Sequence, residues 1–107
     1  MTQVLDQDLI CAIATPPGQG GIGIVRLSGV GAKQVAETIC ERKLVARSAV
    51  YCQFVHGSEH LDDGIALWFP EPQSFTGEEV VELQGHGGPV VQQRIINALC
   101  GLGARLA

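Results

Sequence analysis

The chain has 107 residues, of which 46% are hydrophobic, a size and composition typical of one folded domain with a small core and not of a disordered segment. It has 7 Lys and Arg residues and 11 Asp and Glu residues, so its net charge is -4. The sequence has no cluster of basic residues that could bind a nucleic-acid backbone. The apolar runs are too short to span a bilayer and the N-terminus lacks the basic start of a signal peptide, so we expect a cytoplasmic protein without membrane contact.

Two strands are predicted in the first part of the chain. The apolar run of residues 8–15 ends at a Pro-Pro-Gly sequence and predicts a buried strand followed by a loop. Residues 22–28 alternate as a second strand, which places Arg26 on the same face as two isoleucines. Arg26 is therefore an unusual polar residue in a strand that otherwise has the character of a core.

Two nucleotide-binding motifs are excluded. Residues 18–23 have the glycine spacing of a dinucleotide fingerprint, but that fingerprint turns from a strand into a helix, whereas these glycines lead into the predicted second strand. The sequence GxxxxGK followed by Ser or Thr is also missing, so the phosphate cradle and lysine of a P-loop are not available. This chain by itself is therefore not expected to hydrolyse GTP.

A helix and a pair of strands are expected next. Apolar residues recur at helical spacing after Ser28-Gly29 and predict a helix over residues 32–43. Strands over 49–56 and 64–69 flank the polar segment 57–63, which we interpret as the turn of an antiparallel pair. We place the aromatic residues at the end of the second of these strands in the core, with a subunit contact as the alternative.

The last part of the chain predicts a strand, a helix and the start of another strand. The strand covers 79–85, with Glu78 and Glu79 as its solvated entry, and the helix opens at Pro89 and ends at Gly101. Residues 105–107 have the composition of a further strand. The order of elements predicts an α+β fold, in which two helices pack on a mixed, mostly antiparallel sheet.

The strand over 79–85 carries a row of polar residues. Strand periodicity places Glu82, Gln84 and His86 on one face, so a carboxylate, an amide and an imidazole follow one another. Such a row is costly to bury without partners and suits a polar heterocycle or a second subunit. For His86 the choice is between a ligand donor and a loop histidine with one satisfied hydrogen bond.

Arg26 and Glu82 are the candidate binding residues. A strand carboxylate can accept two hydrogen bonds side by side, which matches the ring N–H and the exocyclic amine of a pterin. Arg26 could make a charge-assisted contact with a ligand carbonyl or carboxylate. The alternative is that the two side chains pair with each other or with backbone groups.

The four cysteines, together with two histidines, raise the question of a metal or redox site. Cys52, His56 and His60 have a four-residue spacing that would suit a metal on a helix, but Cys52 lies in a predicted strand. We interpret the cysteines as buried apolar residues in a reducing compartment and expect no metal site. They are Cys11, Cys40, Cys52 and Cys100.

Two long blocks resemble a known family. Residues 14–29, ATPPGQGGIGIVRLSG, and residues 66–88, which contain ALWFP, SFTGE and ELQGHGG, are similar to the N-terminal domain of the MnmE (TrmE) tRNA modification GTPases. The resemblance covers nearly the whole chain and implies a fold similar to the tetrahydrofolate-binding domain of aminomethyltransferase. It also implies that residues 1–107 form a folate-binding and dimerisation domain.

The resemblance further implies a ligand and partners. It places 5-formyl-tetrahydrofolate between two subunits, with Arg26 and Glu82 as contacts, and leaves the role of Gln19 open. The helical and GTPase domains, with their GTP, Mg²⁺ and K⁺ sites, would lie outside this chain, which would have no catalytic residue of its own. The full-length protein would act with the FAD-dependent MnmG on the wobble uridine of tRNA. The alternative is a pure assembly module without a ligand.

Overall fold

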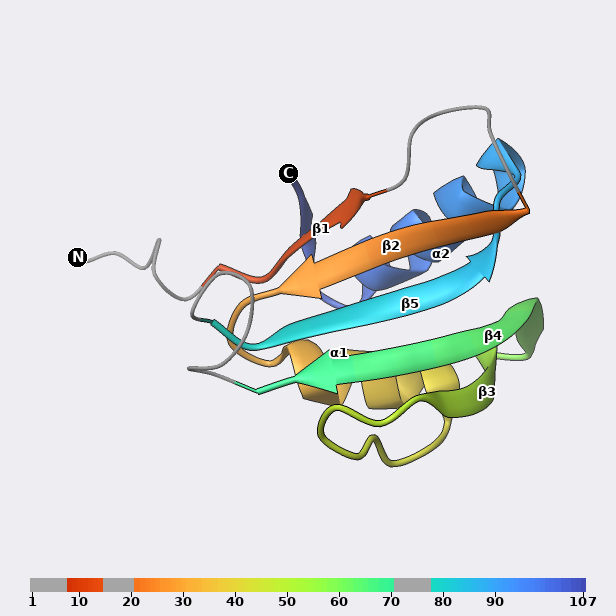
Figure 1. Ribbon diagram of the computed structural model, residues 1–107. Helices are drawn as coiled ribbons and strands as arrows, with labels where there is room; N and C mark the ends of the chain where they lie inside the picture. Colours follow the sequence, from red (N-terminus) through yellow and green to blue (C-terminus); the bar gives the residue numbers. More distant parts are fainter. Residues whose placement is uncertain (1–7, 15–20, 71–77) are drawn as a thin grey trace.

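The computed structural model describes residues 8–14, 21–70 and 78–107. Within these residues, six strands form one sheet, and the two helices cover one of its faces (Figure 1). The spatial order of the strands is β3-β4-β5-β2-β1-β6. The elements in chain order are β1 (Ile10–Ile13), β2 (Ile22–Ser28), α1 (Ala32–Cys40), β3 (Val50–His56), β4 (Glu59–Phe69), β5 (Val80–His86), α2 (Pro89–Gly101) and β6 (Arg105–Leu106).

The pairing of the strands confirms the predicted fold class. β1 and β6 are parallel, and the other neighbouring strands are antiparallel, so the sheet is mixed and mostly antiparallel. With the helices on one face only, the molecule has two layers and an α+β architecture. The central pair, β2 and β5, lies between the β3–β4 hairpin and the short β1 and β6.

The hydrophobic core lies between the sheet and the helices. Alternate residues of β2 and β3 point toward the helices and are almost completely removed from water. The helices contribute the residues that recur every third or fourth position, as an amphipathic helix on a sheet must. The largest fully buried side chains include Val25, Leu27, Ile39, Phe54, Val81, Leu83, Ile95, Ile96 and Leu99. The opposite face of the sheet has no helix over it in the described part of the chain (Figure 1).

The predicted turn between the third and fourth strands was too long. β4 begins at Glu59 and not at residue 64, so Gly57 and Ser58 alone connect the hairpin. Gly57 has φ of 63°, a left-handed conformation that glycine adopts readily in such a tight turn. Polar residues can occupy this end of β4 because they find partners there: Glu59 pairs with Arg94 of α2.

The first helix is shorter than predicted. It ends at Cys40, because Glu41 takes a left-handed conformation with φ of 54° and donates its N–H to the Glu37 carbonyl. The prediction extended this helix to residue 43. The predicted glycine loop that contains Gln19 lies outside the described residues, as do residues 74–77 of the SFTGE block.

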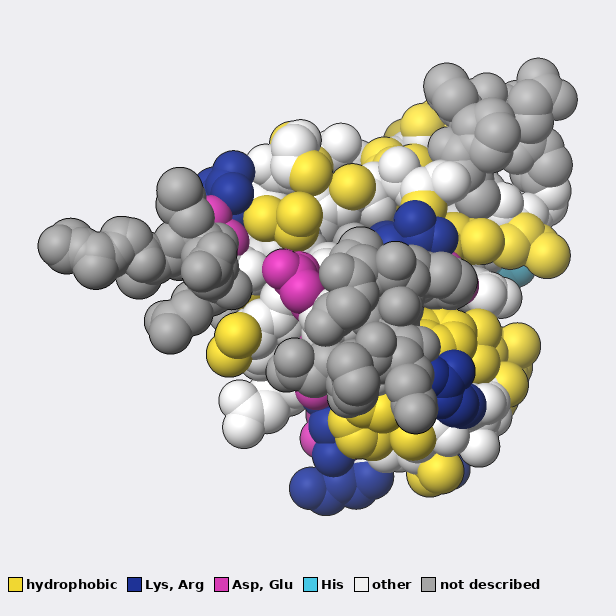
Figure 2. Space-filling view, turned by 60° about the vertical axis from the view of Figure 1, so that its left-hand side comes forward, with side chains coloured by type: hydrophobic (Ala, Val, Ile, Leu, Met, Phe, Trp, Pro, Cys, Tyr) yellow, Lys and Arg dark blue, Asp and Glu magenta, His cyan; other side chains and the backbone are white. Residues whose placement is uncertain are grey.

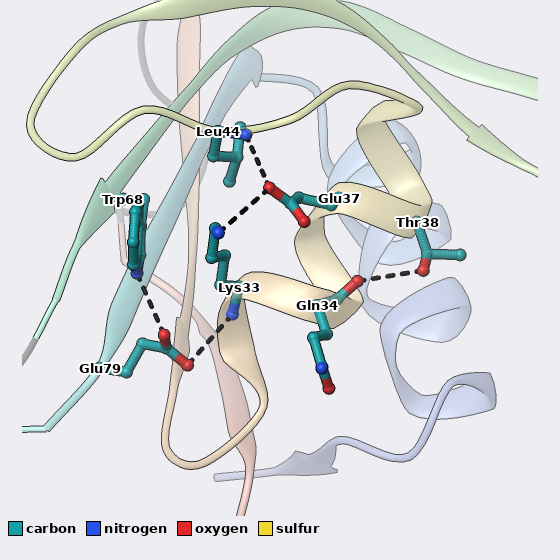
Figure 3. A network of polar contacts seen from close by, with 7 residues as sticks. All are labelled: Lys33, Gln34, Glu37, Thr38, Leu44, Trp68 and Glu79. Carbon is teal, nitrogen blue, oxygen red and sulfur yellow. Dashed lines mark hydrogen bonds and ion pairs between the residues drawn. The ribbon is translucent and has the colours of Figure 1, made fainter.

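Glu79 anchors α1 to the sheet, whereas the sequence predicted a solvated residue. Its carboxylate accepts hydrogen bonds from the Lys33 backbone N–H at 3.3 Å and from the Trp68 indole Nε1 at 3.2 Å (Figure 3). The Lys33 Nζ lies 4.5 Å from the centre of the Trp68 ring and also pairs with Glu37 at 3.7 Å. Glu37 in turn accepts the Leu44 N–H at 2.8 Å, so one network fixes both ends of the helix.

The surface carries mixed charges. In Figure 2, hydrophobic, basic and acidic side chains alternate over the described part of the visible face, without a broad basic patch. This pattern agrees with the net charge of -4. None of the helices in the described ranges is long and apolar enough to cross a membrane.

Candidate functional site

Arg26 and Glu82 meet on the face of the sheet that the helices leave open. They are direct partners in the antiparallel pairing of β2 with β5. Arg26 Nη2 donates to Glu82 Oε2 at 2.7 Å, and Arg26 Nε donates to the same oxygen at 3.3 Å. The structure therefore brings the two predicted site residues together, in the mutual pairing that the sequence left open.

The two members of this pair differ in their exposure to solvent. The Glu82 side chain is 9% exposed, whereas the Arg26 side chain is 40% exposed. The other carboxylate oxygen of Glu82, Oε1, accepts a hydrogen bond from Gln84 Nε2 at 3.3 Å. A buried carboxylate needs such partners, because burying a charged group without them costs on the order of several kcal/mol. Gln84 therefore belongs to the same cluster, as the strand periodicity indicated.

A shallow depression adjoins the arginine. It has a volume of about 220 Å³. It is lined by β1 and the residue that follows it, Ala14, and by Arg26 and Ser28 of β2. Its walls are mostly apolar, and Arg26 supplies the charge. An apolar wall with few polar groups is the usual character of a site for a small organic molecule.

His86 lies at the end of the same strand but is held by a different partner. Its backbone N–H donates to Asp62 Oδ2 at 2.7 Å, and its Nδ1 donates to Asp62 Oδ1 at 2.6 Å. Burial by itself would raise the pKa of Asp62, but the hydrogen bonds from the backbone and ring of His86 outweigh it and hold that pKa below its ordinary value. The sequence left open whether His86 donates to a ligand or has its hydrogen bond satisfied within the chain. The structure shows the second arrangement, with Asp62 as the partner.

Asp62 is the residue that the sequence analysis missed. It was assigned to the turn, but it lies in β4 and is buried. One signal was available: Gly85 lies directly before His86, and a Cβ at Gly85 would collide with Asp62 Oδ2. A glycine at this point of a strand indicates the close approach of another group.

The spacing of Cys52, His56 and His60 does not create a metal site. Cys52 is buried, whereas His60 is exposed and its Nε2 lies 2.8 Å from Asp63 Oδ1. Among the residues that the structure describes, no three His, Cys, Asp or Glu side chains come together as metal ligands could. The three residues stay apart because they lie on a strand and its hairpin and not on a helix.

Comparison with known families gives a match over almost the full chain. The model of the family described as "GTP-binding protein TrmE N-terminus" matches residues 9–107. The chain belongs to the TrmE N-terminus family. The resemblance of the two sequence blocks is thereby confirmed.

Curated relatives of this TrmE N-terminus chain carry the name tRNA modification GTPase MnmE. The protein of Chromohalobacter salexigens is 52% identical over 107 residues, which are 99% of this chain and 23% of that relative. The protein of Hydrogenovibrio crunogenus is 55% identical over 102 residues, or 94% of this chain and 22% of that relative. The protein of Nitrosococcus oceani is 52% identical over 101 residues. The chain thus spans less than a quarter of the length of these relatives.

Proposed function

We propose that this chain is the N-terminal folate-binding and dimerisation domain of a tRNA modification GTPase, and that it binds 5-formyl-tetrahydrofolate. Membership of the TrmE N-terminus family and the names of the relatives support the first part. The observation that carries the second part is the Arg26–Glu82 pair beside an apolar depression. A reduced folate combines a flat heterocycle with polar edges, and this site offers both kinds of contact.

The residues present fit the proposed ligand. A carboxylate has about four lone-pair positions, and the hydrogen bonds from Arg26 and Gln84 use three of them. Glu82 therefore keeps one open position, on Oε1, for an N–H group of a pterin, and the second position that a side-by-side contact needs becomes available on Oε2 when Arg26 turns toward the ligand. The half-exposed guanidinium of Arg26 can turn toward a carbonyl or carboxylate of the ligand. The folate, when bound, supplies the one-carbon unit, and these residues supply binding and orientation.

The activity of the whole protein depends on parts that we place outside this chain. We assign GTP, Mg²⁺ and K⁺ to helical and GTPase domains, and no catalytic residue to this one. An MnmG-type FAD protein would join the homodimer in the cytoplasm, and the complex would modify the wobble uridine of tRNA. The names of the relatives, which combine tRNA modification with GTPase, support this assignment.

Titration calorimetry with 5-formyl-tetrahydrofolate tests the proposed site. We expect binding heat for the wild type and an affinity lower by roughly 10- to 100-fold for Glu82→Gln, because a charge-assisted hydrogen bond contributes about 1.5–3 kcal/mol. Arg94→Gln is the matched control, because it removes another Arg–Glu pair, between α2 and β4, and should leave binding unchanged. Circular dichroism establishes that each variant is folded.

A pure assembly domain is the second candidate, because Arg26 and Glu82 already compensate each other without a ligand. It predicts no binding heat for the wild type at high ligand concentration. It also predicts that Glu82→Gln leaves any folate response unchanged. Either result would reject the folate site and leave the family membership intact.

A further inference from the structure

Two cysteines that are far apart in the sequence come into contact between β1 and α2. The sulfur atoms of Cys11 in β1 and Cys100 near the end of α2 lie 3.9 Å apart, and 89 positions separate the two residues in the chain. A small movement of both side chains would bring the two sulfur atoms to the S–S bonding distance of about 2.05 Å. Both belong to well-defined elements, so the contact is a feature of the fold.

The two thiols differ in accessibility. Cys11 is 1% exposed, whereas Cys100 is exposed to solvent. Burial, with a smaller effect of the adjacent Cys100, raises the pKa of the Cys11 thiol to about 12, so Cys11 is protonated at neutral pH. A dissolved oxidant can therefore reach the sulfur of Cys100 first. The sulfur of Cys11 lies in contact with it and can react next.

We propose that Cys11 and Cys100 form a reversible intramolecular disulfide when a peroxide oxidises Cys100. In the first step the Cys100 thiol loses its proton, its sulfur attacks a peroxide oxygen, and the O–O bond breaks; the products are the sulfenic acid of Cys100 and a hydroxide, which takes up the released proton as water. In the second step the Cys11 sulfur attacks the sulfenic sulfur, the S–O bond breaks, and the proton of Cys11 leaves with the hydroxide as a second water. The two thiols lose two electrons, and the peroxide gains them.

The second cysteine pair provides a contrast within the same molecule. Cys40 and Cys52 hydrogen-bond each other, and this bond together with burial raises the pKa of Cys40. Both residues are buried, at 2% and 4% exposure, so a dissolved peroxide cannot reach either sulfur in the folded chain. We therefore assign the redox chemistry to the pair with one exposed member.

The disulfide would fasten β1 to α2. β1 forms a wall of the depression beside Arg26, so this wall would be held to the helix layer in the oxidised state. A link that closes so long a loop restricts the unfolded chain strongly. We expect a rise of about 10 °C in the midpoint of thermal unfolding, and its loss on treatment with a thiol reductant.

Peroxide treatment of the folded chain, followed by alkylation and peptide mapping, tests the proposal. We expect one cross-linked peptide pair containing Cys11 and Cys100, with Cys40 and Cys52 alkylated only after unfolding. Cys11→Ala should stop the reaction at the sulfenic acid of Cys100, which dimedone traps. Cys52→Ala is the matched control and should leave the cross-link unchanged. Over-oxidised Cys100 beside a free Cys11 thiol, or a cross-link between two chains, would overturn the proposal.

Discussion

Asp62 and Glu82 are both buried carboxylates, and their partners suit them to different tasks. Asp62 accepts a hydrogen bond from a backbone N–H, that of His86, whereas Glu82 accepts from the long side chains of Arg26 and Gln84. A backbone N–H is fixed in place by the strand, so it cannot move to another acceptor as a long side chain can. A half-exposed arginine can exchange its partner for a ligand. We therefore expect Asp62 to stabilise the fold and Glu82 to serve binding.

Replacing Asp62 with Asn should destabilise the chain by about 1–3 kcal/mol at neutral pH, the range for losing hydrogen bonds to a buried charged group. Urea unfolding measures the change. Asp63→Asn is the matched control, because the Asp63 side chain is 45% exposed and pairs with the exposed His60. Its effect should stay below about 0.5 kcal/mol. Equal losses for the two variants would contradict the role given to Asp62.

The same residue predicts the response to acid. The folded-state pKa of Asp62 is lowered, so its stabilising effect is complete above the ordinary aspartate pKa of about 3.9 and is lost as the pH falls through the folded value. The difference in unfolding free energy between wild type and Asp62→Asn should therefore shrink below about pH 4. A difference that is constant down to lower pH would show that the carboxylate charge is not what stabilises β5.

At the scale of elements, the sequence predicted every strand and helix of the described chain but not all of their ends. Periodicity assigned residues 59–63 to a turn, because polar residues at the end of a hairpin have the composition of a loop. The partners that hold them in β4, such as Arg94, come from an element more than thirty residues away. Long-range pairing of this kind is not visible in a local pattern.

The candidate site was predictable to the same extent. Strand alternation placed Arg26 and Glu82 on defined faces of two strands, and the family resemblance singled out both residues. Their contact required the register of β2 with β5, in which the two residues are opposite each other. Asp62 was missed for a related reason: its assignment to a turn hid its position beside Gly85.

Glu79 shows how one side chain can join three elements. Glu79→Ala removes the acceptor of the Lys33 N–H at the start of α1 and of the Trp68 indole in β4. We expect a loss of about 1–2 kcal/mol, the range for removal of a helix cap. Trp68 is the single tryptophan, so its fluorescence should also change in the native state. Glu59→Ala, which breaks an exposed ion pair, is the control and should leave the native emission spectrum unchanged.

At the scale of the whole molecule, the two faces of the sheet differ. The helices cover one face (Figure 1). The other presents the Arg26–Glu82 pair together with exposed apolar side chains. Ile22 is 63% exposed and Tyr51 is 67% exposed, and strand alternation places both on this open face. An apolar surface around a compensated charge pair suits contact with a second copy of the chain. The proposed homodimer would then use the face that also carries the proposed ligand site.

Sedimentation of the chain tests whether the open face is the dimer contact. We expect a dimer at micromolar concentration for the wild type and a dissociation constant at least about tenfold higher for Ile22→Glu, because a buried charge without a partner costs more than 1.4 kcal/mol. Val30→Glu is the control: Val30 is 62% exposed, as Ile22 is, but it lies in the connection between β2 and α1. A monomeric wild type would contradict dimerisation itself. Equal weakening by both variants would contradict only the choice of face, because a general effect of added negative charge would then explain the loss.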